Sequence, residues 1–77
     1  MNFKPGNLVR IRRALPFVRC VNLNTADWYE FKADEIALYL SWGGSKHGGA
    51  YQVAHILIGE VKCAADEADL ELVPVEE

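Results

Sequence analysis

Two histidines, two cysteines and scattered carboxylates are the side chains in this 77-residue sequence that could do chemistry. Covalent catalysis needs a nucleophile, a base and an orienting group within reach of one another. The sequence contains no G-x-S-x-G, H-E-x-x-H or Walker pattern that would supply such a set. Structural zinc sites bring their ligands in close pairs such as C-x₂-C, whereas the nearest pair here is His47 and His55. We therefore expect no enzymatic activity, no cofactor and no metal site.

Cys20 and Cys63 are expected to lie in a reducing compartment, because the sequence carries no signal for secretion or membrane insertion. The first six residues, Met-Asn-Phe-Lys-Pro-Gly, lack the apolar segment of a signal peptide, and no run of 18 apolar residues could span a membrane. In such a compartment the two cysteines are expected to be free thiols.

Basic and acidic side chains are segregated along the chain. Its net charge is −3, yet residues 1–20 contain no acid and residues 59–77 contain seven acids against the single Lys62. The arginines near the start could contact phosphates while neighbouring aromatic rings stack on bases, which is the nucleic-acid-binding alternative. The residues of that alternative are Arg10, Arg12, Arg13 and Arg19. In the competing interpretation the two ends neutralise each other, with Arg10 or Arg12 facing Glu71 across paired first and last strands.

Aromatic side chains favour a protein-interaction module as the main interpretation. Tryptophan and tyrosine dominate the energetics of binding surfaces, and this chain has more aromatic area than a small core needs. We expect at least one of Trp28 and Phe31 to cover the core, and we place Tyr39 on an outward strand face. The predicted partner-binding residues are Phe17, Trp28, Tyr29 and Tyr39. The opposite charges of the two ends also favour self-association, through edge strands meeting across a two-fold axis.

Alternating apolar and polar residues predict five strands that would position these side chains. Residues 8–14 and 35–42 alternate, and the β-rich runs 51–58 and 61–64 are separated only by Gly59-Glu60, which is typical of a type II′ hairpin turn. Residues 70–73 form the last strand. Residues 15–34 are expected to be a long irregular loop, residues 43–49 a glycine-rich hairpin loop, and residues 64–69 a single 3₁₀ turn.

This pattern predicts an all-β fold built as one domain over residues 1–77, with a folded part at 3–73 and a tail at 74–77. About half of the residues are apolar, which is enough for one thin core. The expected core residues are Val9, Ile11, Ile36, Leu38, Leu40, Val53, Leu57, Val61, Leu70 and Leu72.

Three phrases of the sequence carry a resemblance to a known family. They are Phe3-Lys-Pro-Gly-Asn-Leu-Val-Arg10, Glu35-Ile-Ala-Leu-Tyr-Leu40, and Ile56-Leu-Ile-Gly-Glu-Val-Lys62 followed by Asp69-Leu-Glu-Leu-Val73. They resemble small SH3-like barrel proteins of bacteriophages, cyanophages among them, although Asn7 replaces the usual Asp and one residue is missing before Gly59. The resemblance covers about half of the chain. It implies a five-stranded SH3-like barrel that binds partners through its long first loop and the loop between strands two and three.

The resemblance also implies a phage-encoded accessory or virion structural subunit, located in the host cytoplasm or in the virion, and not an enzyme.

Overall fold

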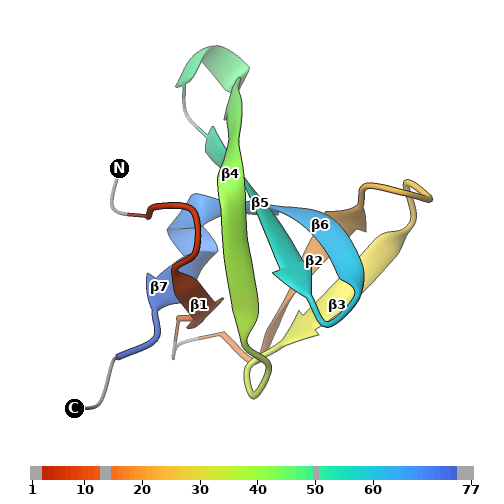
Figure 1. The fold of residues 1–77 in the computed structure, drawn as a ribbon. Coiled ribbons are helices and arrows are strands. Elements are labelled where there is room, and N and C mark those ends of the chain that lie inside the picture. The colour runs from red at the N-terminus through yellow and green to blue at the C-terminus, as the bar shows by residue number, and fades with distance from the viewer. Residues whose placement is uncertain (1–2, 13–14, 50, 75–77) are drawn as a thin grey trace.

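The chain folds into one antiparallel sheet of seven strands that curls into a half-barrel (Figure 1). The computed structural model describes residues 3–12, 15–49 and 51–74. Its strands are β1 (Leu8–Ile11), β2 (Phe17–Asn22), β3 (Trp28–Lys32), β4 (Ala37–Lys46), β5 (Tyr51–Ile58), β6 (Val61–Asp66) and β7 (Leu70–Leu72). Two 3₁₀ turns are η1 (His47–Gly49) and η2 (Glu67–Asp69). The all-β prediction is confirmed, whereas the count of five strands is wrong.

The two additional strands come from the segment that the sequence led us to expect as an irregular loop. Within residues 15–34, β2 and β3 form a hairpin in which Val18 pairs with Phe31, and β2 also pairs with β6. The turn between them is held by the Asn22 side chain, which accepts from the backbone N–H of Asn24, and by Ala26 at a positive φ of 64°. Because asparagine can form such a turn through its side chain, a short polar stretch is enough to reverse the chain here.

Strands β5 and β6 form the tight hairpin expected from Gly59-Glu60. Ile58 pairs with Val61, and Gly59 has a φ of 61°. Among the described residues Ala26 is the only non-glycine with positive φ, so Glu60 keeps a negative φ. One positive φ at the first turn position and none at the second define a type II′ turn, and the prediction is confirmed.

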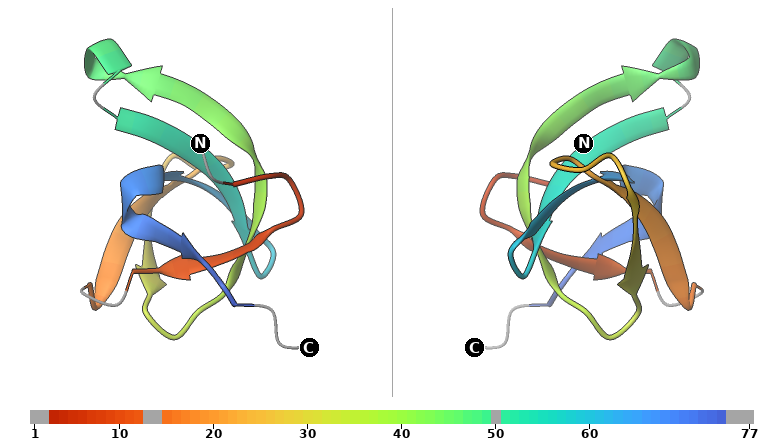
Figure 2. Two further views of the ribbon diagram at one scale, coloured as in Figure 1. Left: turned by 90° about the vertical axis from the view of Figure 1, so that its left-hand side faces the viewer. Right: turned by 90° about the vertical axis from the view of Figure 1, so that its right-hand side faces the viewer.

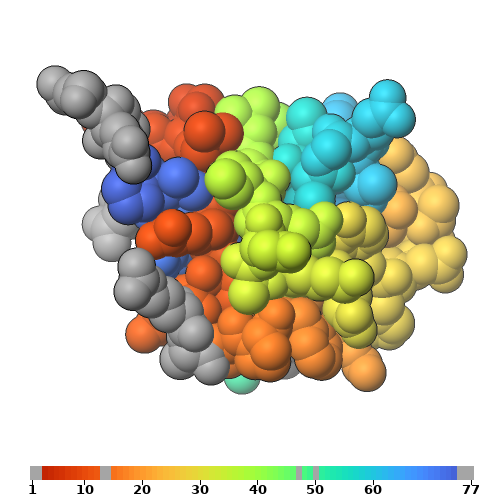
Figure 3. Space-filling view, turned by 90° about the horizontal axis from the view of Figure 1, so that it is seen from below, coloured from red at the N-terminus to blue at the C-terminus, as the bar shows by residue number. Residues whose placement is uncertain are grey.

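The first and last strands of the sheet pair with each other, as expected. β1 lies antiparallel to β7 with Arg10 opposite Glu71, and the sheet order is β3-β2-β6-β5-β4-β1-β7. Figure 2 shows the strands curving around a common interior, with the far ends of β4 and β5 extending beyond it. In the view from below in Figure 3, the β2–β3 hairpin (orange to yellow) and the residues that lead into β4 (yellow-green) are both visible on this face.

The core is confirmed only in part, because β4 turns the opposite face inward from the one predicted. Ile36 is 53% exposed and Leu38 and Leu40 are half-buried, whereas Ala37 and Tyr39 are buried. Residues 36–40 are apolar throughout, so alternation alone does not choose a face, and a shift by one residue exchanges the two faces. The buried hydrophobic set is Val9, Ile11, Cys20, Phe31, Ala37, Tyr39, Ala54, Ile56, Ile58, Cys63, Ala65 and Leu70.

The same inversion applies to β5, whereas the predicted face of β7 is kept at Leu70 and lost only at Leu72. Val53 and Leu57 are half-buried on the outer face of β5, while Ile56 lies inside. Leu72 is exposed at the sheet edge, so its placement in the core is wrong, and Val61 is half-buried and packs against the core. Val9, Ile11 and Leu70 are buried as predicted. Among the described residues, no helix has the length and apolar character needed to cross a bilayer.

Candidate interaction surface

The outer face of the β2–β3 hairpin carries the most exposed aromatic side chain of the described residues. Trp28 opens β3 and is 69% exposed, and its cross-strand neighbour on β2 is Val21. Directly paired residues of an antiparallel ladder point to the same side of the sheet. The inner residues Cys20 and Phe31 are fully buried. The hairpin therefore buries one face in the core and presents Trp28 and Val21 on the other.

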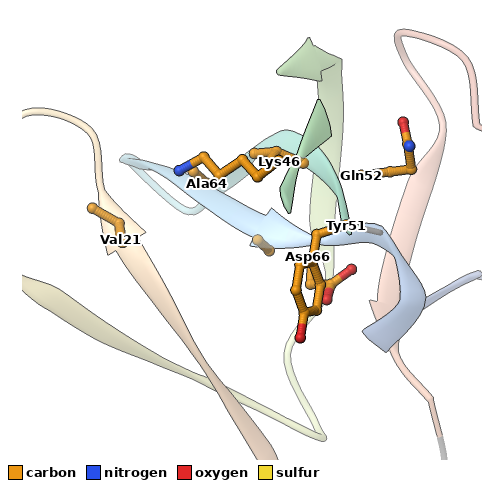
Figure 4. Close-up of a pocket in the computed structure, with 8 residues that line it drawn as sticks. Val21, Lys46, Tyr51, Gln52, Ala64 and Asp66 are labelled. Carbon is orange, nitrogen blue, oxygen red and sulfur yellow. The ribbon is translucent and has the colours of Figure 1, made fainter. Parts of the chain in front are cut away.

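A groove of about 290 Å³ begins at Val21 and crosses the neighbouring strands (Figure 4). It lies between β2 and the far end of the β4–β5 hairpin, with β6 forming its floor. Its lining combines apolar side chains with a lysine, an acid, an amide and a phenol, in the set Val21, Lys46, Tyr51, Gln52, Val53, Ala64, Ala65 and Asp66. Trp28 does not line this groove, but its cross-strand neighbour Val21 does.

The four aromatic residues predicted to bind a partner separate into three environments. Phe17 is exposed and lies on the same outer face as Val21, four residues before it on β2. Tyr29 is half-buried, and its hydroxyl donates to Glu35 Oε2 over 3.1 Å. Burial, and then the hydrogen bond to Glu35, raise the pKa of Tyr29. Phe17 and Trp28 are thus accessible, and the Tyr29 hydroxyl is engaged within the fold.

Tyr39 lies inside the core, and its predicted outward placement is wrong. Its side chain is 2% exposed, packs 5.6 Å from the Phe3 ring centre, and donates from its hydroxyl to Glu67 Oε2 over 3.2 Å. Burial raises the pKa of Tyr39, and the negative charge of Glu67 adds to the effect. Glu67 is itself buried. Tyr39 therefore positions a buried carboxylate and does not contribute to the outer surface.

The arginines of the nucleic-acid alternative are divided between two regions of the sheet. Arg10 Nε contacts Glu71 Oε2 at 2.7 Å, so the predicted pairing between the two ends of the chain is confirmed. Arg12 Nη1 donates to the Ala68 carbonyl over 3.0 Å. Burial raises the pKa of Asp69 and the negative charge of Asp66 adds to the effect, while the positive charge of Arg12 opposes it. Arg19 lies on β2 opposite Glu30. Arg13 lies outside the described residues.

The structure describes both thiols and the imidazole of His55. Cys20 and Cys63 are both free, as predicted, and both are buried. Burial, supplemented by the negative charge of Cys63, raises the pKa of Cys20 to about 12, which leaves the sulfur protonated and poorly nucleophilic at neutral pH. His55 is half-buried over Gly43. The side chain of His47 lies outside the described part of the structure. Among the described residues no group of three or more His, Cys, Asp or Glu side chains could hold a metal ion.

Sequence reasoning missed the part of the groove contributed by the β4–β5 hairpin. It treated residues 43–49 as a flexible loop, whereas β4 continues to Lys46 and pairs Lys46 with Tyr51. The signal that could have indicated this longer hairpin is the placement of Lys46 and Tyr51 on the two sides of the glycine-rich turn. A second hollow of about 410 Å³ lies near the chain ends, lined by Gly6, Asn7, Leu8, Leu72, Val73 and Pro74, without an aromatic ring.

No protein-family model, curated protein or solved structure matches this chain.

Proposed function

We propose that this chain is a small non-catalytic protein-interaction module that binds a segment of a partner protein in the groove beside Trp28. The observation that carries the proposal is the indole itself, which is 69% exposed on the strand next to Val21, a residue that lines the groove. An exposed tryptophan offers a large contact area at little entropic cost, and such residues supply much of the energy at protein interfaces. The mixed lining of the groove suits a peptide, because apolar walls give affinity and a few polar groups fix orientation.

We further propose that the fold is an SH3-like barrel whose first connection contains a hairpin. In this reading the barrel strands are β1, β4, β5, β6 and β7, and β2–β3 is an elaborated first loop. The 3₁₀ turn η2 before β7 and the β1–β7 pairing support the assignment. The groove lies between β2 and the β4–β5 turn, the two regions through which the resemblance leads us to expect partner binding. We also propose that the protein is a phage-encoded accessory or virion subunit that acts in the host cytoplasm or in the virion.

Charge placement favours a protein partner over a nucleic acid. Arg10 is paired with Glu71, Arg19 lies opposite Glu30, and Arg12 lies within the influence of Asp69. Arg10 is on the second strand from one edge of the sheet and Arg12 follows that strand, while Arg19 is on the second strand from the other edge. A nucleic-acid surface instead gathers unpaired cations along the path of a phosphate backbone.

Selection from a random peptide library displayed on yeast tests the proposed function. The immobilised wild-type protein should enrich sequences that bind at least about tenfold more weakly to Trp28→Ala. The matched control is Ile36→Ala, which removes an exposed apolar side chain from the segment just before β4 and should leave binding unchanged. Enriched peptides that bind equally to wild type and Trp28→Ala would contradict the proposal.

Titration with a single-stranded oligonucleotide over a salt series distinguishes nucleic-acid binding, the alternative function, from peptide binding. We expect no binding at low salt. Binding that weakens steeply with salt, and that is lost in Arg19→Ala but not in Trp28→Ala, would support the nucleic-acid interpretation instead.

A further inference from the structure

The edge strand β3 has an open stretch of backbone whose limits are defined by hydrogen bonds. Among the strands that the structure describes, β3 pairs only with β2, so its other side is a sheet edge. Asn22 N donates to the Asp27 carbonyl, and Ala33 N donates to the Pro16 carbonyl. Backbone groups in an antiparallel ladder alternate between the two sides of a strand. This alternation directs the N–H and C=O groups of Tyr29 and Phe31 toward β2, and those of Trp28, Glu30 and Lys32 toward the open edge.

The Lys32 end of this edge is closed by the chain itself. Lys32 N donates to Glu35 Oε1 over 2.9 Å, and Glu35 N donates to the Lys32 carbonyl over 3.0 Å. Among the described residues, no side chain or turn makes a comparable hydrogen bond to the backbone of Trp28 or Glu30. At the other end, Ala26 leaves the extended conformation with its φ of 64°. The open stretch therefore consists of Trp28 and Glu30, with Tyr29 between them.

We propose that this edge pairs with the same edge of a second copy of the chain, forming a two-fold symmetric dimer with a continuous antiparallel sheet. Self-pairing centred on Tyr29 places Trp28 of each copy opposite Glu30 of the other. Each such pair exchanges both of its backbone hydrogen bonds, so every open group of the stretch is satisfied.

The alternative symmetric registers are disfavoured by the same geometry. A register centred on Glu30 places two carboxylates directly opposite each other and sets Trp28 against Lys32, whose backbone groups Glu35 already occupies. A register centred on Trp28 sets Glu30 against Ala26, whose N–H already donates to the Asn22 carbonyl. Only the register centred on Tyr29 uses both open residues of each copy and separates the glutamates.

The dimer leaves the groove of the proposed function open. A two-fold axis that joins strands edge to edge is perpendicular to the sheet, so outward side chains of both copies stay on one side. Trp28 and Val21 of each copy would then lie on a common surface with two grooves. A partner with two binding segments would gain avidity from this arrangement.

Sedimentation equilibrium of the full chain over micromolar to millimolar concentrations tests the proposal. Wild type should show reversible dimerisation, and Glu30→Pro should weaken it by about tenfold or more, since proline removes the N–H that faces the second copy. That N–H lies outside the ladder with β2, and proline is tolerated at such edge positions. The matched control Glu30→Ala keeps the N–H and should dimerise like wild type. Leu72→Pro alters the opposite edge strand and should also dimerise.

Amide hydrogen exchange of the wild-type chain provides a second measurement that does not depend on the folding of a proline variant. The amides of Trp28 and Glu30 should become protected as concentration rises, while amides of β7 should not change. A chain that stays monomeric at millimolar concentration would overturn the proposal. A dimer whose Trp28 and Glu30 amides exchange as fast as in the monomer would also overturn it. Because these readouts need no peptide ligand, their failure is distinguishable from failure of the proposed function.

Discussion

At the scale of single residues, the same side-chain type serves opposite roles in this protein. Tyr39 was expected outside and Trp28 or Phe31 inside; the structure buries Tyr39 and Phe31 and exposes Trp28. The sequence predicts that aromatic residues matter here, but not which of them the core takes. That choice depends on strand register and on buried polar partners such as Glu67, which are set by tertiary contacts.

The Tyr39 hydroxyl gives a prediction that isolates one buried hydrogen bond. Tyr39→Phe should lower the free energy of unfolding by about 1–2 kcal/mol, because Glu67 would lose its donor while remaining inside the fold. Urea denaturation at neutral pH measures the loss. The double variant Tyr39→Phe with Glu67→Gln should be less affected than the sum of the single variants, since the two changes act on one interaction. Additive effects would show that the hydroxyl and the carboxylate act independently.

At the scale of elements, β4 is the strand that sequence patterns describe least well. Its pairing with β5 shifts register between Tyr39 and Ser41 and again between Trp42 and Ser45. These irregularities interrupt simple alternation beyond Tyr39. Before them, the uniformly apolar run from Ile36 to Leu40 gave no signal for which face is buried. By contrast, the β5–β6 hairpin was predictable, because Gly59 permits a positive φ that the turn requires. The β2–β3 hairpin was missed, since its turn residues gave only a weak local signal.

A glycine in the bent part of β4 gives an element-scale prediction. A Cβ on Gly43 would lie 2.6 Å from His55 Nε2 and 3.0 Å from Val53 Cγ1, so these side chains would have to move. Gly43→Ala should lower the free energy of unfolding by about 1–3 kcal/mol. In a His55→Ala background the same substitution should cost less, because the closest contact is gone. Ser45→Ala, farther along β4 and exposed, is the control. An equal cost in both backgrounds would contradict this packing.

At the scale of the whole molecule, the half-barrel encloses both thiols and predicts how stability changes in alkali. The Cys20 pKa is about 12 in the fold against 9.0 as its ordinary value, because burial disfavours the thiolate. Below pH 9.0 the thiol is protonated in both states. As the pH rises toward about 12, the unfolded chain loses this proton and the folded chain retains it, so stability falls across that window.

Cys20→Ala tests this linkage. Urea denaturation between pH 8 and pH 10 should give a shallower decline of the free energy of unfolding for the variant than for wild type, even though the variant starts lower because of its small cavity. The comparison stops near pH 10.0, the ordinary pKa of tyrosine, because Tyr29 and Tyr39 contribute above it. Identical slopes for the two proteins would mean that the Cys20 thiol is not shielded from water.

Trp28→Ala, measured for stability and for binding in the same preparation, tests the central proposal most directly. The free energy of unfolding should stay within about 0.5 kcal/mol of wild type, because the indole is largely in solvent. Affinity for a peptide selected on the wild-type protein should fall by about tenfold or more. A loss of about 3–5 kcal/mol in stability would place the indole in the core. Unchanged peptide affinity in a stable variant would contradict its role as the anchor.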